Sequence, residues 1–243
     1  MRRIGIDVGS TYTKYCILNP DGDIESLFAE KTPIKQKTYF DQKIKDFRMK
    51  YGDAIEVISC GYGKSNVEGI KQINELTALA RGTYYVYSEE SYVLDIGGQD
   101  TKIIRQQNGK LKEFYINDKC AAGSGIFLAS VCNMLSVSLK DIYIEPDISI
   151  KLSSVCAVFA QSEIVELISN NYKEQEIISA VVAQIFRQSK KLIEKIECEE
   201  LLLSGGLTQI KGVECLAEKI LNKKCKVSEK SNYISAIGCA LLN

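Results

Sequence analysis

Two stretches with one shared pattern decide the fold of this chain: RRIGIDVGSTYTK at residues 2–14 and YVLDIGGQDTK at residues 92–102. Each begins with an apolar strand, reaches an Asp, passes through a small-residue turn and resumes with hydroxyl-bearing and lysine residues. Glycine lets a backbone approach a polyphosphate, turn N–H groups can point at its oxygens, and an Asp at a strand end can hold hydrated Mg²⁺. The repeat therefore predicts two phosphate-binding hairpins that face each other across one nucleotide.

The turn residues follow directly from this pattern. The first phosphate turn is predicted to consist of Gly9, Ser10 and Thr11, and the second of Gly97, Gly98 and Gln99. Asp7 and Asp95 are predicted to hold Mg²⁺ through water, since a matched pair is less readily explained as two plain tight turns. Lys14 either approaches a phosphate or is a solvated strand lysine. For Thr101 and Lys102, a contact with phosphate and a plain strand position are likewise both possible.

Strand patterns followed by helical patterns occur in both halves of the chain, which predicts an internally duplicated α/β protein. We expect a first domain over residues 1–92, closed by a C-terminal helix at 232–243, and a second over 93–231. The segment 66–82 has helical periodicity and is expected to form a helix that stops at Gly82.

Composition limits the chemistry. The 243 residues are 45% hydrophobic and 26% charged, and 31 basic residues balance 31 acidic ones, which argues against bulk attraction to nucleic acid or to an anionic membrane. No apolar stretch near the start is long enough for a secretory signal or a membrane span, so we expect a cytoplasmic protein. The absence of histidine excludes histidine bases and histidine-ligated zinc, leaving carboxylates, thiolates, lysine and a bound ligand.

Nine cysteines without regular spacing do not form a secreted disulfide pattern. Most of them are expected to be buried small residues, namely Cys16, Cys60, Cys132, Cys198, Cys215, Cys225 and Cys239. Cys120 in NDKCAAGSG and Cys156 in SSVCAVFAQSE differ because both precede a predicted helix. A helix N-terminus favours the thiolate, which attacks electrophiles and binds metal. A functional role and a buried structural role both remain open for this pair. Two thiols are too few for a closed four-cysteine site, but a symmetric dimer would supply two more.

Taken together, DVGSTYTK, NELTALARG, DIGGQDTK, NDKCAAGSG, SSVCAVFAQSE and LLLSGGL resemble the activator ATPases of 2-hydroxyacyl-CoA dehydratases, in the group that also holds ATPase subunits of benzoyl-CoA reductase. The resemblance runs essentially end to end. The phosphate motifs alone are similar to the wider superfamily of actin, sugar kinases and 70-kDa heat-shock proteins, whereas the two cysteine motifs are specific to the activator branch.

This resemblance implies a duplicated actin-like, ribonuclease H-like ATPase fold with two domains around a nucleotide cleft. It also implies a homodimer that binds ATP or ADP with Mg²⁺ in each subunit and carries one 4Fe-4S cluster per dimer, held by Cys120 and Cys156 of each chain. Such activators take an electron from ferredoxin or flavodoxin. They pass it, as ATP is hydrolysed, to an iron-sulfur dehydratase or related reductase in an anaerobic setting.

The resemblance also suggests further roles, each beside a plainer interpretation. Glu75 would position the hydrolytic water or magnesium, but otherwise reads as a surface carboxylate. Ser204, Gly205 and Gly206 would turn against adenine or ribose, or form an ordinary strand-to-helix turn. Gln161, Ser162 and Glu163 would brace the cluster or the nucleotide, and Asn117, Asp118 and Lys119 would tune the first cysteine or form a partner surface; Glu163 and Lys119 are equally explained as solvated charges.

Two rival functions share the phosphate motifs. A small-molecule kinase of the same superfamily would need a hydroxyl substrate and a carboxylate base, and gives neither helix-start cysteine a task. A non-catalytic, nucleotide-controlled interaction protein of the heat-shock or filament type would leave both cysteine placements to chance.

Overall fold

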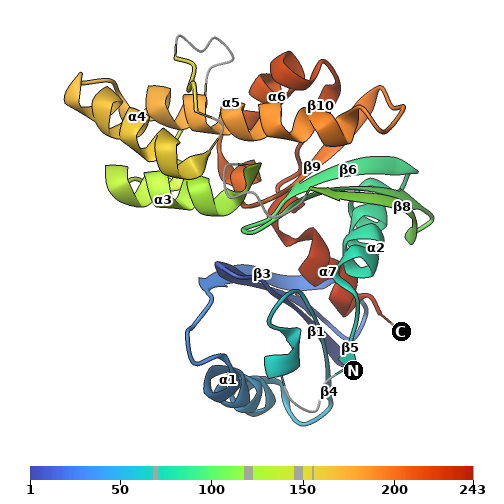
Figure 1. Cartoon of the computed structure of the whole chain (residues 1–243). Coiled ribbons are helices and arrows are strands. Elements are labelled where there is room, and N and C mark those ends of the chain that lie inside the picture. Colours follow the sequence, from blue (N-terminus) through green and yellow to red (C-terminus); the bar gives the residue numbers. More distant parts are fainter. Residues whose placement is uncertain (68–70, 118–122, 145–149, 155, 243) are drawn as a thin grey trace. The chain divides into compact units, whose positions relative to one another are not determined.

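The computed structural model describes residues 1–67, 71–117, 123–144, 150–154 and 156–242 (Figure 1). Its strands are β1 (Arg2–Val8), β2 (Tyr12–Leu18), β3 (Ile24–Lys31), β4 (Ile55–Cys60), β5 (Lys71–Gln72), β6 (Ser91–Ile96), β7 (Thr101–Gln107), β8 (Lys110–Asn117), β9 (Glu200–Gly205) and β10 (Lys224–Lys226). Its α-helices are α1 (Gln36–Tyr51), α2 (Glu75–Tyr87), α3 (Gly125–Leu135), α4 (Ala157–Ser169), α5 (Glu174–Ile193), α6 (Val213–Leu221) and α7 (Ile234–Ala240).

The strands form two five-stranded sheets with one topology. The first sheet has the order β3-β2-β1-β4-β5, and the second, read from β8, has the corresponding order β8-β7-β6-β9-β10. In both, the strand that carries the motif Asp pairs in parallel with the fourth strand of the order, β1 with β4 and β6 with β9. The internal duplication and the α/β class predicted from the repeated motifs are therefore confirmed.

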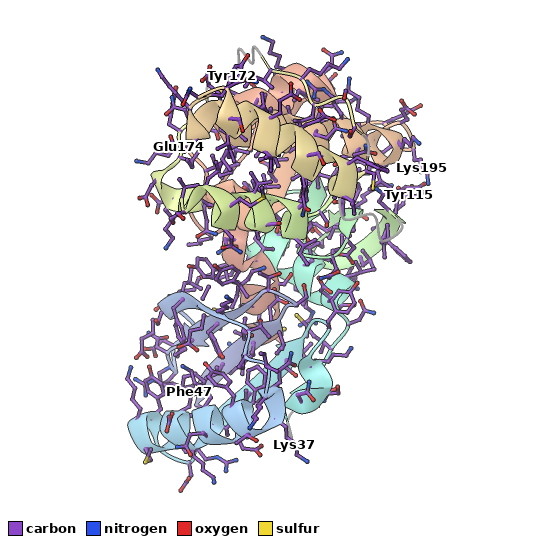
Figure 2. All side chains as sticks on the ribbon, turned by 60° about the vertical axis from the view of Figure 1, so that its left-hand side comes forward. Lys37, Phe47, Tyr115, Tyr172, Glu174 and Lys195 are labelled. Atoms are coloured by element: carbon purple, nitrogen blue, oxygen red, sulfur yellow. The ribbon has the colours of Figure 1, made fainter. Side chains whose placement is uncertain are left out.

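The chain divides into two compact units. The first comprises residues 1–90, 105–113 and 233–243, and the second comprises residues 91–104 and 114–232. In the first unit, alternate side chains of β1, including Ile4 and Ile6, share a buried core with Phe40 and Phe47 of α1. Figure 2 labels Phe47 on α1. This alternation is expected of a strand covered on both faces.

The opposite face of the first sheet is covered by α7, which packs against β1 at very short range. A Cβ added at Gly5 would lie 2.0 Å from the Ala236 carbonyl oxygen, so only glycine permits this approach. Ala236 and Ile237 of α7 share a second core cluster with Cys16 and Leu18 of β2.

The expected stop at Gly82 is wrong, because α2 runs from Glu75 to Tyr87 and passes through this glycine. Residues 71–72 of the predicted helical segment form β5 instead. A Cβ at Gly82 would lie 1.9 Å from the Ile234 carbonyl oxygen, and one at Gly238 would lie 1.7 Å from the Ala78 carbonyl oxygen. The two glycines therefore mark a close crossing of α2 and α7 rather than a helix end.

The second unit is built around α5, in which every residue from Ile177 to Phe186 is buried. Helices α3, α4, α5 and α6 lie together in Figure 1, and their apolar side chains share one core with Leu94 and Ile96 of β6. Lys195, just after α5, places its Nζ 5.4 Å from the ring centroid of Tyr115 on β8, and Figure 2 shows the two side chains together. Among the described residues, no helix has the length and hydropathy needed to cross a membrane.

Candidate functional site

The predicted first phosphate turn, between β1 and β2, is held by hydrogen bonds. The Gly9 N–H donates to the Asp7 carbonyl at 3.1 Å. Thr32, the residue after β3, donates its hydroxyl to the Gly9 carbonyl at 2.8 Å and its N–H to the Thr11 carbonyl at 2.9 Å. Ser10, at the centre of this turn, is exposed. The turn is thus pre-formed by protein hydrogen bonds and presents its central residue outward.

Both carboxylate oxygens of Asp7 have protein contacts. Lys14, its register partner on β2, places Nζ 3.3 Å from Oδ2, and the Cys60 thiol lies 3.7 Å from Oδ1. Only 5% of Asp7 is exposed. Lys14 therefore pairs with the predicted magnesium carboxylate, which neither of its two sequence interpretations included. Cys60, read from the sequence only as a buried small residue, is indeed buried but also contacts Asp7.

Glu75 is the first residue of α2, whose N-cap Asn74 accepts a hydrogen bond from the Leu76 N–H at 2.8 Å. The pKa of the Cys60 thiol is raised, first by its hydrogen bond with Cys239 and by burial, and also by the negative charges of Asp7 and Glu75. The negative charges of both carboxylates therefore act on the Cys60 thiol. The structure accordingly brings Asp7 and Glu75, 68 residues apart in sequence (75 − 7), into one electrostatic neighbourhood.

The predicted second phosphate turn repeats the lysine–aspartate pair of the first and adds a second carboxylate, that of Asp100. Lys102 is only 1% exposed, and its Nζ lies 3.6 Å from Asp95 Oδ2 and 3.2 Å from Asp100 Oδ1. Asp100 also accepts the Gly97 N–H through its carbonyl at 2.9 Å. Sequence reasoning missed Asp100, although its position directly before the repeated Thr-Lys pair is a usable signal. Gly98 and Gln99 complete the turn.

The turn is fastened to α3. The N–H groups of Gly125 and Ile126, the first two residues of α3, donate to the carbonyls of Gly97 and Gly98 at 2.8 and 3.0 Å. Thr101 adds a hydrogen bond from its hydroxyl to the Gly123 carbonyl. Helix α3 and the turn at Gly97 are therefore one hydrogen-bonded assembly, which explains the buried position of Thr101.

The motif at residues 204–206 lies beside the second phosphate turn. In the parallel pairing of β6 and β9, Asp95 is opposite Ser204 and Ile96 is opposite Gly205. Gly205 has φ +101°, and a Cβ there would lie 2.1 Å from the Ile96 carbonyl oxygen, so this position requires glycine. Around Gly206, by contrast, an added Cβ would meet nothing within 4 Å. The pairing of β6 with β9 thus places residues 204–206 beside the second turn, and the space around Gly206 is open.

Cys156 is the N-cap of α4 and is exposed. Its carbonyl accepts the Ala160 N–H at 2.9 Å, while its side chain makes no capping bond. The thiol therefore lies at a helix N-terminus, as predicted, and is not engaged by its own helix. Cys132 is buried in α3, and burial raises its pKa to about 11, in agreement with its structural interpretation.

The first cysteine motif lies partly outside the described residues. Asp118, Lys119 and Cys120 belong to the segment that is not described, while Asn117 is the last residue of β8. Within the described ranges, no group of three or more cysteine or acidic side chains has the arrangement of a metal site.

The remaining predicted residues lie on α4. Gln161 is exposed and donates its Nε2 to Ser130 Oγ of α3 at 3.5 Å, and Ser162 is also exposed. Glu163 points to the segment that precedes Cys156, where it accepts hydrogen bonds from Ser153 and Ser154.

Two activators of 2-hydroxyacyl-CoA dehydratases are similar to this chain along nearly its whole length. It is 34% identical over 248 residues to the (R)-2-hydroxyglutaryl-CoA dehydratase activating ATPase of Acidaminococcus fermentans, with 98% of this chain and 95% of the relative covered. The crystal structure of component A of that organism's dehydratase superposes with a TM-score of 0.83 at 30% identity, covering 99% of this chain and 96% of the other. The activator of 2-hydroxyisocaproyl-CoA dehydratase from Clostridium difficile, with bound ADPNP, gives 0.84 at 28% identity, with 99% and 93% covered.

These likenesses confirm the predicted actin-like fold. A glucokinase from Streptomyces griseus also superposes, with a TM-score of 0.59 at 12% identity and 99% and 98% of the two chains covered, which shows the fold alone. The model of the BadF/BadG/BcrA/BcrD ATPase family matches residues 4–243. Because this match extends over almost every residue, the chain belongs to the BadF/BadG/BcrA/BcrD ATPase family.

Proposed function

We propose that this protein is an ATP-dependent activator that delivers a low-potential electron to a 2-hydroxyacyl-CoA dehydratase or a related iron-sulfur reductase. The family match and the named relatives support the ATPase and activator parts of this proposal. The observation that carries it is the exposed thiol of Cys156 at the N-cap of α4, because a kinase of this fold has no task for such a thiol.

The proposed nucleotide ligands are residues of the two phosphate turns and of the open glycine motif, namely Gly9, Ser10, Thr11, Lys14, Gly97, Gly98, Gln99, Ser204, Gly205 and Gly206. Asp7 and Asp95 would hold Mg²⁺ through water, and Glu75 would orient the attacking water. The Cys60 thiol supports this grouping. Its pKa is raised mainly by the hydrogen bond with Cys239 and by burial, but the charges of both Asp7 and Glu75 add to the effect.

The residues present also fit a cluster ligand. Iron-sulfur clusters are held by cysteine thiolates, and Cys156 offers an exposed thiol at the N-cap of α4 that makes no capping bond with its own helix. We propose that Cys156 and Cys120 of two chains hold one 4Fe-4S cluster in a homodimer, with ferredoxin or flavodoxin as the electron donor. The cluster would supply one-electron chemistry; the protein supplies the ligands and the ATP-binding residues.

The ATPase part of the proposal is tested by measuring phosphate release from ATP without any added hydroxyl substrate. We expect steady hydrolysis by the anaerobic wild-type protein and a loss of roughly 100-fold in Glu75→Gln, because water would no longer be oriented for attack. Phosphoryl transfer to a sugar or alcohol, with no hydrolysis in its absence, would contradict the proposal and favour a kinase.

A further inference from the structure

Glu163 closes a hydrogen-bonded loop between the second turn of α4 and the segment that precedes this helix. Its Oε2 accepts the Ser153 N–H at 2.7 Å, and its Oε1 accepts the Ser153 hydroxyl at 2.8 Å and the Ser154 N–H at 2.7 Å. One carboxylate thus receives three short bonds from two consecutive residues. Such charge-assisted bonds are stronger than bonds between neutral groups.

This arrangement differs from ordinary helix capping. In a capping box, the carboxylate that reaches back to the helix start is the third residue after the N-cap. Glu163 is the seventh residue after the N-cap Cys156 (163 − 156) and reaches beyond the cap to Ser153 and Ser154. It therefore holds the incoming backbone, and not the first turn of α4.

A second helix holds the same backbone. Gln184 of α5, itself only 6% exposed, donates its Nε2 to the Ser154 carbonyl at 3.5 Å. Ser154 is therefore held through its N–H by α4 and through its carbonyl by α5, two residues before the cysteine. Ser153 is exposed, so water could satisfy its polar groups if Glu163 did not. The bonds from Ser153 to Glu163 are therefore not needed merely to give buried polar groups a partner.

We propose that Glu163 is a positioning residue for Cys156. By fixing Ser153 and Ser154, it fixes where the backbone enters α4, and hence where the exposed N-cap thiol lies. Glu163 acts through these two serines. This inference rests on the proposed role of Cys156 as a cluster ligand and adds the residue that orders that ligand before the cluster binds. Outer partners of metal ligands commonly act in this way.

The test compares Glu163→Gln with Glu166→Gln. Both substitutions remove one negative charge from α4, but Glu166 lies one turn further along and is exposed. In Glu163→Gln, an amide donor faces the Ser153 N–H in place of Oε2. In the metal-free protein, we expect the amide hydrogens of Ser153 and Ser154 to exchange about tenfold faster in Glu163→Gln and at the wild-type rate in Glu166→Gln.

The second measurement is the rate at which the iron-loaded protein loses iron to a ferrous chelator. We expect this rate to rise roughly tenfold in Glu163→Gln and to stay unchanged in Glu166→Gln. If Glu163→Gln does not fold, Ser153→Ala removes one of the three bonds and should shift both rates in the same direction by a smaller factor.

Unchanged amide exchange in Glu163→Gln would overturn the proposal. Faster exchange with wild-type iron loss would also overturn it, because the segment would then be held for structural reasons only. A wild-type protein that never takes up iron would overturn the proposed function, and with it any positioning role; this failure is distinguished by the wild-type control alone.

Discussion

Lys102 Nζ lies 3.6 Å from Asp95 Oδ2, and this contact repeats the one between Lys14 Nζ and Asp7 Oδ2 at 3.3 Å. In each half the lysine follows its aspartate by seven residues (102 − 95 and 14 − 7). The duplication seen in the sequence is therefore also a duplication of ion pairs. Each proposed magnesium carboxylate already has a lysine beside it, which limits the cost of holding a negative charge at a nearly buried position.

The two lysines should differ in their effect on stability. We expect Lys102→Met to lower the free energy of unfolding by about 3 kcal/mol, because it leaves Asp95 and Asp100 without their shared buried cation. Lys14→Met should cost only about 1 kcal/mol, since 18% of its side chain reaches solvent. Urea denaturation of both variants gives the comparison. Equal losses would contradict the burial argument.

The adjacent glycines Gly205 and Gly206 should respond differently to alanine. We expect Gly205→Ala to destabilise the fold by more than about 2 kcal/mol, because its φ of +101° and the Ile96 carbonyl both oppose a Cβ. Gly206→Ala should change stability by less than about 0.5 kcal/mol, but weaken ATP binding if the nucleotide occupies the open space there. Thermal denaturation and nucleotide titration separate the two effects. Wild-type ATP affinity in Gly206→Ala would remove this residue from the proposed site.

ATP hydrolysis should depend on Mg²⁺ through Asp7 and Asp95. We expect EDTA to abolish hydrolysis, and Asp95→Asn to raise the Mg²⁺ concentration for half-maximal activity by roughly tenfold, because the carboxylate would hold the ion through water. Asp21→Asn, at an exposed turn residue, is the control for loss of one charge. The same Mg²⁺ requirement in both variants would argue against Asp95 as a magnesium residue.

The hold of Glu163 on the segment before Cys156 should weaken only in strong acid. Burial on its own raises the pKa of Glu163, but hydrogen bonds from Ser154 and Ser153 outweigh it and lower the pKa from 4.5 to about 2. A carboxyl with a depressed pKa contributes its full stabilisation above the unfolded value near 4.5, and this contribution is lost as the pH falls toward 2. Carbon NMR of the Glu163 carboxyl should show a midpoint near 2, and Ser153→Ala should raise it. A midpoint at 4.5 would show that these bonds do not form in solution.

The position of the two glycine turns could be predicted from local sequence, whereas contacts that depend on non-local pairing could not. An apolar strand followed by Asp and glycine identifies each turn within a few residues. That Asp95 lies opposite Ser204 depends on the register of β6 and β9, which are separated by more than a hundred residues. The motif at 204–206 could therefore be recognised, but its neighbour could not.

Residue type did not predict a residue's role where that role depends on a partner distant in sequence. Gly82 has the usual signature of a helix end, but its partner across the crossing is Ile234 of α7, which no local pattern indicates. Cys60 was correctly expected to be buried, yet its contact with Asp7 arises only from the parallel pairing of β4 with β1. These details were decided by tertiary packing.

The central claim is that this ATPase carries a cluster held by cysteines from two chains, and iron analysis tests it most directly. The protein would be purified without oxygen, and iron and sulfide per chain measured with the spin-resonance spectrum after reduction, for wild type, Cys120→Ser and Cys156→Ser. We predict about two irons per chain, from one 4Fe-4S cluster shared by two chains, and loss of that iron in both variants. An iron-free wild-type protein that still hydrolyses ATP would contradict the account.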